Sequence, residues 1–428
     1  MKAIVRVAQL LLLCLLSVAG PARAELTIQI TKGVEGALPI AIVPFGGNAG
    51  APDDIAAIVT ADLKRSGRFA PLAPSQFIDR PTEFGQINFG NWRSLQVNHV
   101  AVGSVRAGGN GYTVQFQLAD VFQGGQVMAY SFDVRANELR RLAHHIADLI
   151  YEKLTGEKGA FATRIAYITA APGGRSYALV VADSDGYNPQ TVLRSAQPIM
   201  SPAWSPDGTR LAYVTFENRT SQIVVQDVYS GARQTISASP GINGAPTWAP
   251  DGRRLAFTLS KDGNPEIYAY DLGGGTLTRL TTSSAIDTEA AWSPDGSSIV
   301  FTSDRGGSPQ LYRTPASGGS AERISFAGDY NARPAFSPDG KSVALMSRSG
   351  GRFAIAVLNL ATRQQKTLTE GGMDESPSFA PNGSMIIYAT QRGGRGVLAA
   401  VSVDGRVQQT LLSQEGDVRE PAWAPYTR

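Results

Sequence analysis

The sequence predicts an α/β N-terminal domain followed by an all-β six-bladed β-propeller that is closed by pairing of its N- and C-terminal strands. Two observations lead to this prediction. A short motif of the form "PAWSPDG" recurs six times in the second part of the chain. Stretches with helical spacing of apolar residues occur only before residue 160, so the repeated part is built from strands.

The repeat has an almost constant period. Its copies are "PAWSPDG" at 202–208, "PTWAPDG" with Trp248, "AAWSPDG" with Trp292, "PAFSPDG" with Phe336, "PSFAPNG" with Phe379 and "PAWAP" with Trp423. The steps from one aromatic residue to the next are 44, 44, 44, 43 and 44 residues. A fixed period of this size indicates a radial or stacked array in which each repeat is one supersecondary unit.

Each period contains four pieces of strand length, which is the composition of a propeller blade. The first piece carries the aromatic residue, and the second follows the Asp-Gly turn, as in "RLAYVTF" at 210 and "RLAFTLS" at 254. The second piece is apolar almost without alternation. This is expected for a strand whose two faces are both covered by neighbouring blades.

The two ends of the repeated region predict how the ring closes. "RIAYITA" at 164–170 resembles a second strand without a first strand before it, and "REPAWAP" at 419–425 is a first strand with nothing after it. Pairing of these two segments completes a sixth blade. Closure also removes the exposed sheet edges that an open array would present.

The region before residue 160 has mixed periodicity. Strands are expected at 38–45, 99–105, 112–121 and 126–134. Helices are expected at 53–67, with Ile55, Val59 and Leu63 on one face and Gly67 at the end, and at 137–156, which ends at Gly156. We therefore divide the chain into residues 1–24, 25–160 (α/β domain) and 161–428 (propeller).

Residues 1–24 have the pattern of a secretory signal peptide. Lys2 and Arg6 precede a short apolar run, and Ala22-Arg-Ala24 supplies a small-residue cleavage site, so the mature chain is expected to start at Glu25. Cleavage removes the single cysteine, which excludes disulfides. It also lowers the formal charge from +3 to 0, which gives no electrostatic reason to expect nucleic acid or an anionic membrane surface as a partner.

Side chains suited to catalysis or metal binding are few. Residues 161–428 contain no His and no Cys, which excludes Ser-His triads and His-type metal sites there. Turn chemistry accounts for the repeated Asp-Gly pairs without calcium, and inter-blade packing accounts for the aromatic residues. His144 and Asp148 have a spacing that could form a metal pair, but a solvated polar helix face is the default interpretation. We expect no catalytic residues, metal or cofactor.

The chain resembles the TolB family of the Tol–Pal system of Gram-negative bacteria. The resemblance rests on the signal peptide, the mature start "ELTIQITKGVEGALPIAIVPF" and the six repeats, and it covers essentially the whole chain. It implies a non-enzymatic periplasmic adaptor that supports envelope integrity and constriction during division. It also implies that the propeller binds the lipoprotein Pal and that the mature N-terminus binds TolA.

The predicted partner site on the propeller lies in the loops that enter the six innermost strands. These loops converge on one mouth of the central channel, and they vary while the framework repeats, although they could also be ordinary solvated loops. Asn243, Ala245, Thr288 and Glu289 match Pal-contacting stretches of the family, and Ala290 departs from its usual Pro. The expected Pal-binding residues are Met200, Ser201, Asn243, Gly244, Ala245, Asp287, Thr288, Glu289, Asn331, Arg333, Asp374, Glu375 and Arg419.

The mature N-terminus alternates apolar and polar residues at 26–31 and is followed by the glycine-flanked segment "KGVEGALP". Such a strand can dock on its own domain, add to a partner by strand pairing, or form a simple edge strand. The resemblance implies a TolA-binding segment comprising Glu25, Leu26, Thr27, Ile28, Gln29, Ile30 and Thr31.

Two other function classes remain open. A six-bladed propeller enzyme would need convergent carboxylates in the channel, for which Asp287, Glu289, Asp374 and Glu375 are the available residues. A peptidoglycan-binding module would need exposed aromatic residues, yet most aromatic residues occupy repeat-equivalent core positions.

Overall fold

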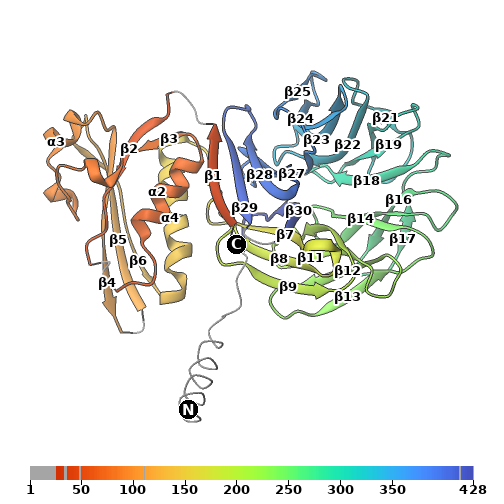
Figure 1. The fold of residues 1–428 in the computed structure, drawn as a ribbon, viewed down its shortest axis with the longest axis horizontal. Coiled ribbons are helices and arrows are strands. Elements are labelled where there is room, and N and C mark those ends of the chain that lie inside the picture. The colour runs from red at the N-terminus through yellow and green to blue at the C-terminus, as the bar shows by residue number, and fades with distance from the viewer. Residues whose placement is uncertain (1–25, 33–35, 48–49, 110, 414–415, 428) are drawn as a thin grey trace, which may run out of the picture.

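The computed structural model describes residues 26–32, 36–47, 50–109, 111–413 and 416–427. It contains an α/β domain beside a six-bladed β-propeller, as predicted (Figure 1). The predicted signal peptide and its cleavage site lie outside the described residues. Within the described ranges, no helix is long and apolar enough to cross a membrane.

The N-terminal domain is a five-stranded mixed sheet of order β3-β2-β4-β5-β6. β2 is parallel to both β3 and β4, and the remaining pairs are antiparallel. Successive residues of β2 enter two different cores, because side chains alternate across a strand. The strands are β2 (Leu38–Ile42), β3 (Phe69–Pro71), β4 (His99–Gly108), β5 (Gly111–Asp120) and β6 (Gly125–Val134).

Two helices pack on the face of this sheet that is turned towards the propeller (Figure 1). Helix α2 (Ile55–Arg65) starts at Asp54, whose carboxylate accepts a hydrogen bond from the Ala57 amide. Helix α4 (Leu139–Thr155) ends at Gly156, which has φ +78°. Both helices follow the sequence prediction. The short helix α3 (Phe89–Ser94) on the opposite face was not predicted, because six residues are too few to show a periodic stripe.

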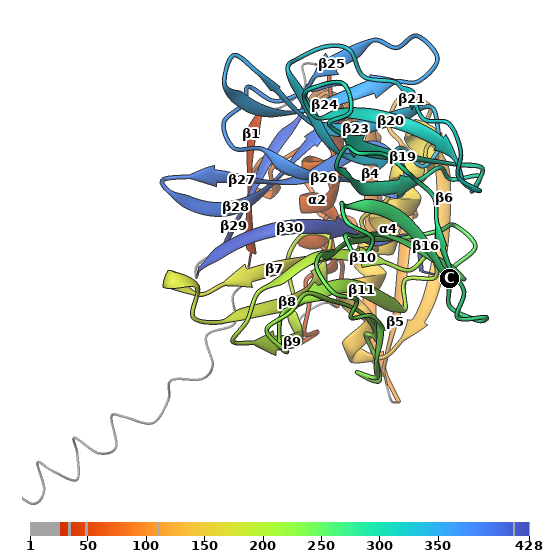
Figure 2. The same cartoon turned by 90° about the vertical axis from the view of Figure 1, so that its right-hand side faces the viewer.

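The propeller consists of six sheets, each with four strands of the repeat, and Figure 2 looks onto it with the N-terminal domain behind. Its blades, from inner to outer strand, are as follows: β30 (Asp417–Trp423), β7 (Arg164–Ala170), β8 (Tyr177–Asp183) and β9 (Gln190–Ser195); β10 (Ile199–Trp204), β11 (Arg210–Thr215), β12 (Gln222–Asp227) and β13 (Arg233–Ser237); β14 (Asn243–Trp248), β15 (Arg254–Leu259), β16 (Glu266–Asp271) and β17 (Leu277–Arg279); β18 (Asp287–Trp292), β19 (Ser298–Ser303), β20 (Gln310–Pro315) and β21 (Glu322–Arg323); β22 (Tyr330–Phe336), β23 (Ser342–Ser349), β24 (Arg352–Asn359) and β25 (Gln365–Thr367); β26 (Glu375–Phe379), β27 (Met385–Arg392), β28 (Arg395–Ser402) and β29 (Gln408–Ser413).

The ring closes between β30 and β7, which confirms the predicted composite blade. The two strands are antiparallel, with Trp423 opposite Ile165. Two of the repeated tryptophans link neighbouring blades by hydrogen bonds: Trp204 Nε1 donates to the Ala422 carbonyl at 3.1 Å, and Trp248 Nε1 donates to the Ala203 carbonyl at 3.2 Å. These aromatic residues are core elements that connect one blade to the next.

The Asp-Gly motifs form the predicted turns. The Asp207 carboxylate accepts hydrogen bonds from the Ser205 hydroxyl and the Thr209 amide, and Asp251 accepts from the amides of Arg253 and Arg254. Each aspartate is therefore used by its own turn, as turn chemistry requires.

The N-terminal strand β1 (Leu26–Lys32) does not join the sheet of the N-terminal domain. It pairs antiparallel with β29 and becomes a fifth strand of the last blade, with Ile28 opposite Leu411 (Figure 1). The strand is thus an edge strand, as one of the sequence-based possibilities had it, but it lies on the propeller of the same chain and not on its own domain, which the sequence analysis did not predict.

Candidate functional site

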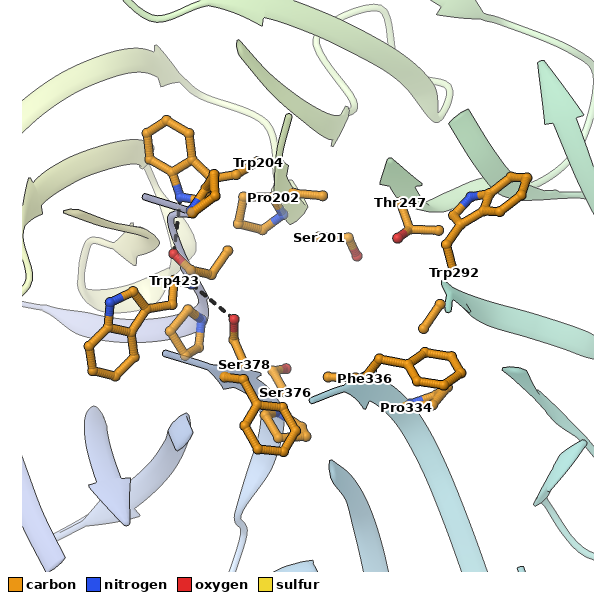
Figure 3. A pocket seen from close by; sticks show the side chains of 18 of the residues that line it. Ser201, Pro202, Trp204, Thr247, Trp292, Pro334, Phe336, Ser376, Ser378 and Trp423 are labelled. Carbon is orange, nitrogen blue, oxygen red and sulfur yellow. Dashed lines mark hydrogen bonds between the residues drawn. The ribbon is translucent and has the colours of Figure 1, made fainter. Parts of the chain in front are cut away.

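The six inner strands surround a central channel with a volume of about 590 Å³. Figure 3 shows their side chains arranged around the opening. Each strand contributes one residue with φ between +46° and +55°, a left-handed conformation that is uncommon outside glycine. We call this set the αL ring; its members are Ser201, Ala245, Glu289, Arg333, Ser376 and Glu420.

A β-bulge places each member of the αL ring. In every inner strand the pairing register shifts at this point, for example between Met200 and Ala203 and between Thr288 and Ala291. A bulge inserts an unpaired residue and re-aims its side chain. Strained backbone that recurs at equivalent positions of a concave site is a feature of functional sites.

The polar centre of the channel is organised around Arg333. Its Nε lies 3.3 Å from Glu289 Oε1, and its guanidinium also contacts Glu375 and the Ser376 hydroxyl. Burial tends to lower the pKa of Arg333, but the surrounding glutamates raise it above its usual value. Burial raises the pKa of Glu420, although Arg333 opposes this effect. The channel therefore holds one cation among several carboxylates.

Four of the sequence-predicted residues are buried at the starts of inner strands and fasten the loops at the mouth. The Asn243 side chain accepts from the Ser237 hydroxyl at 2.6 Å, and Arg305 pairs with Asp287 at 2.6 Å. Two further buried residues follow the same pattern. Asn331 donates to the Ala327 carbonyl, and Asp374 accepts from the Thr369 hydroxyl, each at 2.6 Å. The four side chains shape the mouth without facing solvent: Asn243, Asp287, Asn331 and Asp374.

The other predicted residues are half-buried or exposed, and Ser201, Ala245, Glu289 and Arg333 among them line the channel. The full set is Met200, Ser201, Gly244, Ala245, Thr288, Glu289, Arg333, Glu375 and Arg419. The prediction omitted Ser376 and Glu420, which are the αL-ring members of the last two inner strands. Their position directly before Pro377 and Pro421 was the signal that could have identified them.

The rim of the mouth also carries exposed apolar side chains that the sequence reasoning missed. Ile242, Ile286 and Met373 each directly precede one of the buried fastening residues, and they are 50%, 48% and 53% exposed. Met200 on the neighbouring inner strand is 38% exposed. Apolar side chains that recur around a concave polar centre are typical of a surface that binds another protein.

Comparisons with known proteins match two separate parts of the chain. The family described as "TolB amino-terminal domain" matches residues 26–127, and the family described as "TolB beta propeller domain" matches residues 151–427. The chain belongs to the TolB family.

Individual relatives of the TolB family are similar over different lengths. The "Tol-Pal system protein TolB" of Methylococcus capsulatus is 55% identical over 231 residues, and that of Thioalkalivibrio sulfidiphilus is 54% identical over 240 residues. These matches span about half the length of the curated relatives, 54% and 55%. The crystal structure of TolB from Acinetobacter baumannii is 43% identical, with a TM-score of 0.89, and the match covers 94% of this chain and 100% of that chain.

The N-terminal strand β1, which contains most of the predicted TolA-binding segment, lies over an apolar cavity of about 40 Å³ between the two domains. Ile28 and Leu411 contribute to its wall, together with Trp423 of the closing strand. Gln29 and Ile30 are exposed. Glu25, the first residue of the predicted TolA-binding segment, lies outside the described residues.

The carboxylates available for an enzymatic channel are already engaged. Asp287 and Asp374 are buried against Arg305 and Thr369, whereas Glu289 and Glu375 both face Arg333. Two of the four carboxylates therefore hold loops in place, and the other two form ion pairs with Arg333.

The helix pair of His144 and Asp148 differs from the prediction of a solvated polar face. His144 is only 2% exposed; its Nδ1 lies 2.6 Å from Asp62 Oδ2 in α2, and its Nε2 lies 3.8 Å from Asp185 Oδ2 of the propeller. The Asp148 carboxylate instead accepts from the amides of Phe161 and Ala162 at 2.7 and 3.1 Å. The prediction was wrong because helical spacing alone does not reveal a neighbouring domain.

Proposed function

We propose that this chain is a non-enzymatic periplasmic component of the Tol–Pal system. In this proposal the propeller mouth binds the lipoprotein Pal, and the mature N-terminus, released by cleavage after Ala24, binds TolA. The names of its relatives as Tol–Pal system proteins support membership of the system. The resulting adaptor would support outer-membrane integrity and envelope constriction during division.

The observation that carries the Pal assignment is the combination of rim and centre at one mouth. Exposed apolar residues surround a channel whose polar groups are held by strained backbone and by ion pairs. Tight protein interfaces use apolar anchors around a few well-placed charges. A loop of a partner protein that carries an apolar anchor and a polar tip would fit this surface.

The proposed contact set is the exposed or half-buried part of the predicted residues, together with the apolar rim. The four buried fastening residues act indirectly, by holding the loops in shape. The proposed contacts are Met200, Ser201, Ile242, Gly244, Ala245, Ile286, Thr288, Glu289, Arg333, Met373, Glu375 and Arg419.

Charge introduced on the rim is expected to weaken Pal binding without unfolding the protein. Ile286→Glu and Met373→Glu should each reduce affinity at least tenfold, about 1.4 kcal/mol, because a buried carboxylate replaces an apolar anchor. The melting temperature should hardly change, since both side chains are about half exposed. Isothermal titration calorimetry with purified Pal and thermal melting measure the two effects.

Leu277→Glu is the matched control for this experiment. Leu277 is 39% exposed, but it lies on the outermost strand of its blade, away from the channel. This variant should bind Pal like the wild type. Unchanged Pal affinity in both rim variants would place the Pal site elsewhere on the molecule.

A further inference from the structure

Both helices of the N-terminal domain contact the turn between β8 and β9 of the propeller. From α2, the Arg65 guanidinium donates to the Ser184 hydroxyl at 2.9 Å. From α4, the Arg140 guanidinium pairs with Asp183 and Asp185 and covers the ring of Tyr187 at 3.7 Å. The contact between the domains is thus polar and highly charged at this point.

His144 lies at the centre of this contact, between one carboxylate from each domain. Its Nδ1 is 2.6 Å from Asp62 Oδ2 in α2, and its Nε2 is 3.8 Å from Asp185 Oδ2 in the propeller. Within the described residues, Nε2 has no hydrogen-bond partner, although it is buried. An imidazolium ion would attract both carboxylates, whereas a neutral ring can donate to only one of them.

The charges of the cluster indicate which species it accommodates. Among the described residues, its three carboxylates, Asp62, Asp183 and Asp185, pair with two guanidinium groups, those of Arg65 and Arg140. One additional positive charge balances the cluster, and burying an unbalanced charge is costly. A divalent cation at Asp62, His144 and Asp185, whose ligand atoms lie within 4.8 Å of one another, would overshoot this balance and compete with both arginines. A proton on His144 supplies the one additional positive charge without competing with the arginines.

The other charged or titratable groups around His144 are engaged elsewhere or open to solvent. Asp148, on the same helix, accepts two amide hydrogen bonds from residues 161 and 162. Arg141 is exposed, and Arg164 donates to the Gly208 carbonyl and lies 5.4 Å from the ring of Tyr229. None of these groups replaces the proton between Asp62 and Asp185.

We propose that His144 is a proton-dependent clamp between the two domains, protonated when they are docked and weakening their contact when it loses the proton. Arg65 extends the effect towards the N-terminal strand, because its carbonyl accepts from Gln409, the residue opposite Ile30 of β1. Arg65 and Ile28 also line the same interdomain cavity. Loss of the proton therefore weakens both the contact between the domains and the docking of β1 on the propeller.

The direction of the pH dependence follows from the shift of the pKa. Burial lowers the pKa of His144, but Asp62 and Asp185 together outweigh burial and raise it above 6.5. The clamp is therefore complete below pH 6.5 and is lost as the pH rises through the pKa of the folded protein. Burial raises the pKa of Asp148 to about 6, so that group titrates on the acid side of this window.

The protonation state can be observed directly, because the chain contains only three histidines. We expect one imidazole resonance of the full chain to titrate above pH 6.5 and to disappear in His144→Asn. Asp185→Asn should shift this titration to lower pH, whereas His145→Asn, on the next residue of the helix, should leave it in place. The proposal would be overturned if the His144 resonance titrated below pH 6.5, or if Asp185→Asn did not change the pH at which it titrates.

The clamp itself is measured by amide hydrogen exchange of the full chain between about pH 6 and 9. Protection of residues 183–187 and of β1, corrected for intrinsic exchange, should fall several-fold with rising pH in the wild type. In His144→Asn it should be low and independent of pH, and in His145→Asn it should follow the wild type. Protection that does not change with pH in the wild type would refute the clamp.

A metal is tested in the same samples. With zinc added or removed by a chelator, the exchange of residues 183–187 should be unchanged. If zinc restores protection at high pH in the wild type but not in His144→Asn, the site is a metal site, and the proton-dependent clamp is wrong.

Discussion

A chain that stops after Ser413 is expected to lose the whole propeller in a single cooperative transition. The truncation removes β30, whose residue Val418 is fully buried, together with the buried Ala424 that follows it, and leaves the inner edge of β7 without a partner. It also removes Trp423, which donates to the Thr163 hydroxyl at 2.9 Å. Circular dichroism and calorimetry of the purified protein would detect this loss.

Two further variants show that the effect comes from closure. A chain that ends at Tyr426 keeps β30 and the hydrogen bond from the Tyr426 hydroxyl to the Gly159 carbonyl, so it should melt like the wild type. Trp423→Ala should be intermediate, destabilised by about 3 kcal/mol. If the chain truncated after Ser413 retained the native melting temperature, closure would not be what holds the ring together.

Deletion of Glu25–Thr31 is expected to abolish TolA binding while leaving Pal binding intact. The proposed TolA segment is removed completely, whereas the propeller mouth, built from loops of other strands, keeps its residues. The propeller should remain folded, because β29 stays paired with β28. Pull-down and calorimetry with TolA and with Pal would measure the two affinities separately.

Ile28→Asp is the informative companion to this deletion. It keeps the segment but places a charge against the apolar cavity beneath β1, which favours the undocked strand. If TolA binds this strand when it is free, the variant should bind TolA more tightly than the wild type. Loss of Pal and TolA binding together in the deletion would contradict separate sites.

The features that the sequence predicted are those encoded by local or periodic signals. The count of six blades follows from the spacing of the aromatic residues, and closure follows from the unmatched segments that contain Ile165 and Trp423. The ends of α2 and α4 were predicted from Gly67 and Gly156, because glycine adopts positive φ without strain.

The features that were missed depend on contacts between distant segments. The pairing of β1 with β29 joins residues far apart in the sequence, and no local pattern specifies that partner. His144 is buried by a propeller turn that is separate from its own helix. The prediction for the mouth named Asn243 and Asp287 as candidate contacts, but both side chains are buried. Whether a polar loop residue is buried depends on the loops packed around it, and the sequence alone does not specify that packing.

The αL ring separates the shape of the channel from its chemistry. The bulges fix the backbone at six equivalent points, yet the residues found there are Ser, Ala, Glu, Arg, Ser and Glu. The conformational strain is a property of the backbone and is similar for each of these side chains. Charge, size and polarity at six positions can therefore be exchanged during evolution or engineering while the scaffold stays constant. The chemistry at the centre of the channel can therefore change without a change in the backbone that shapes it.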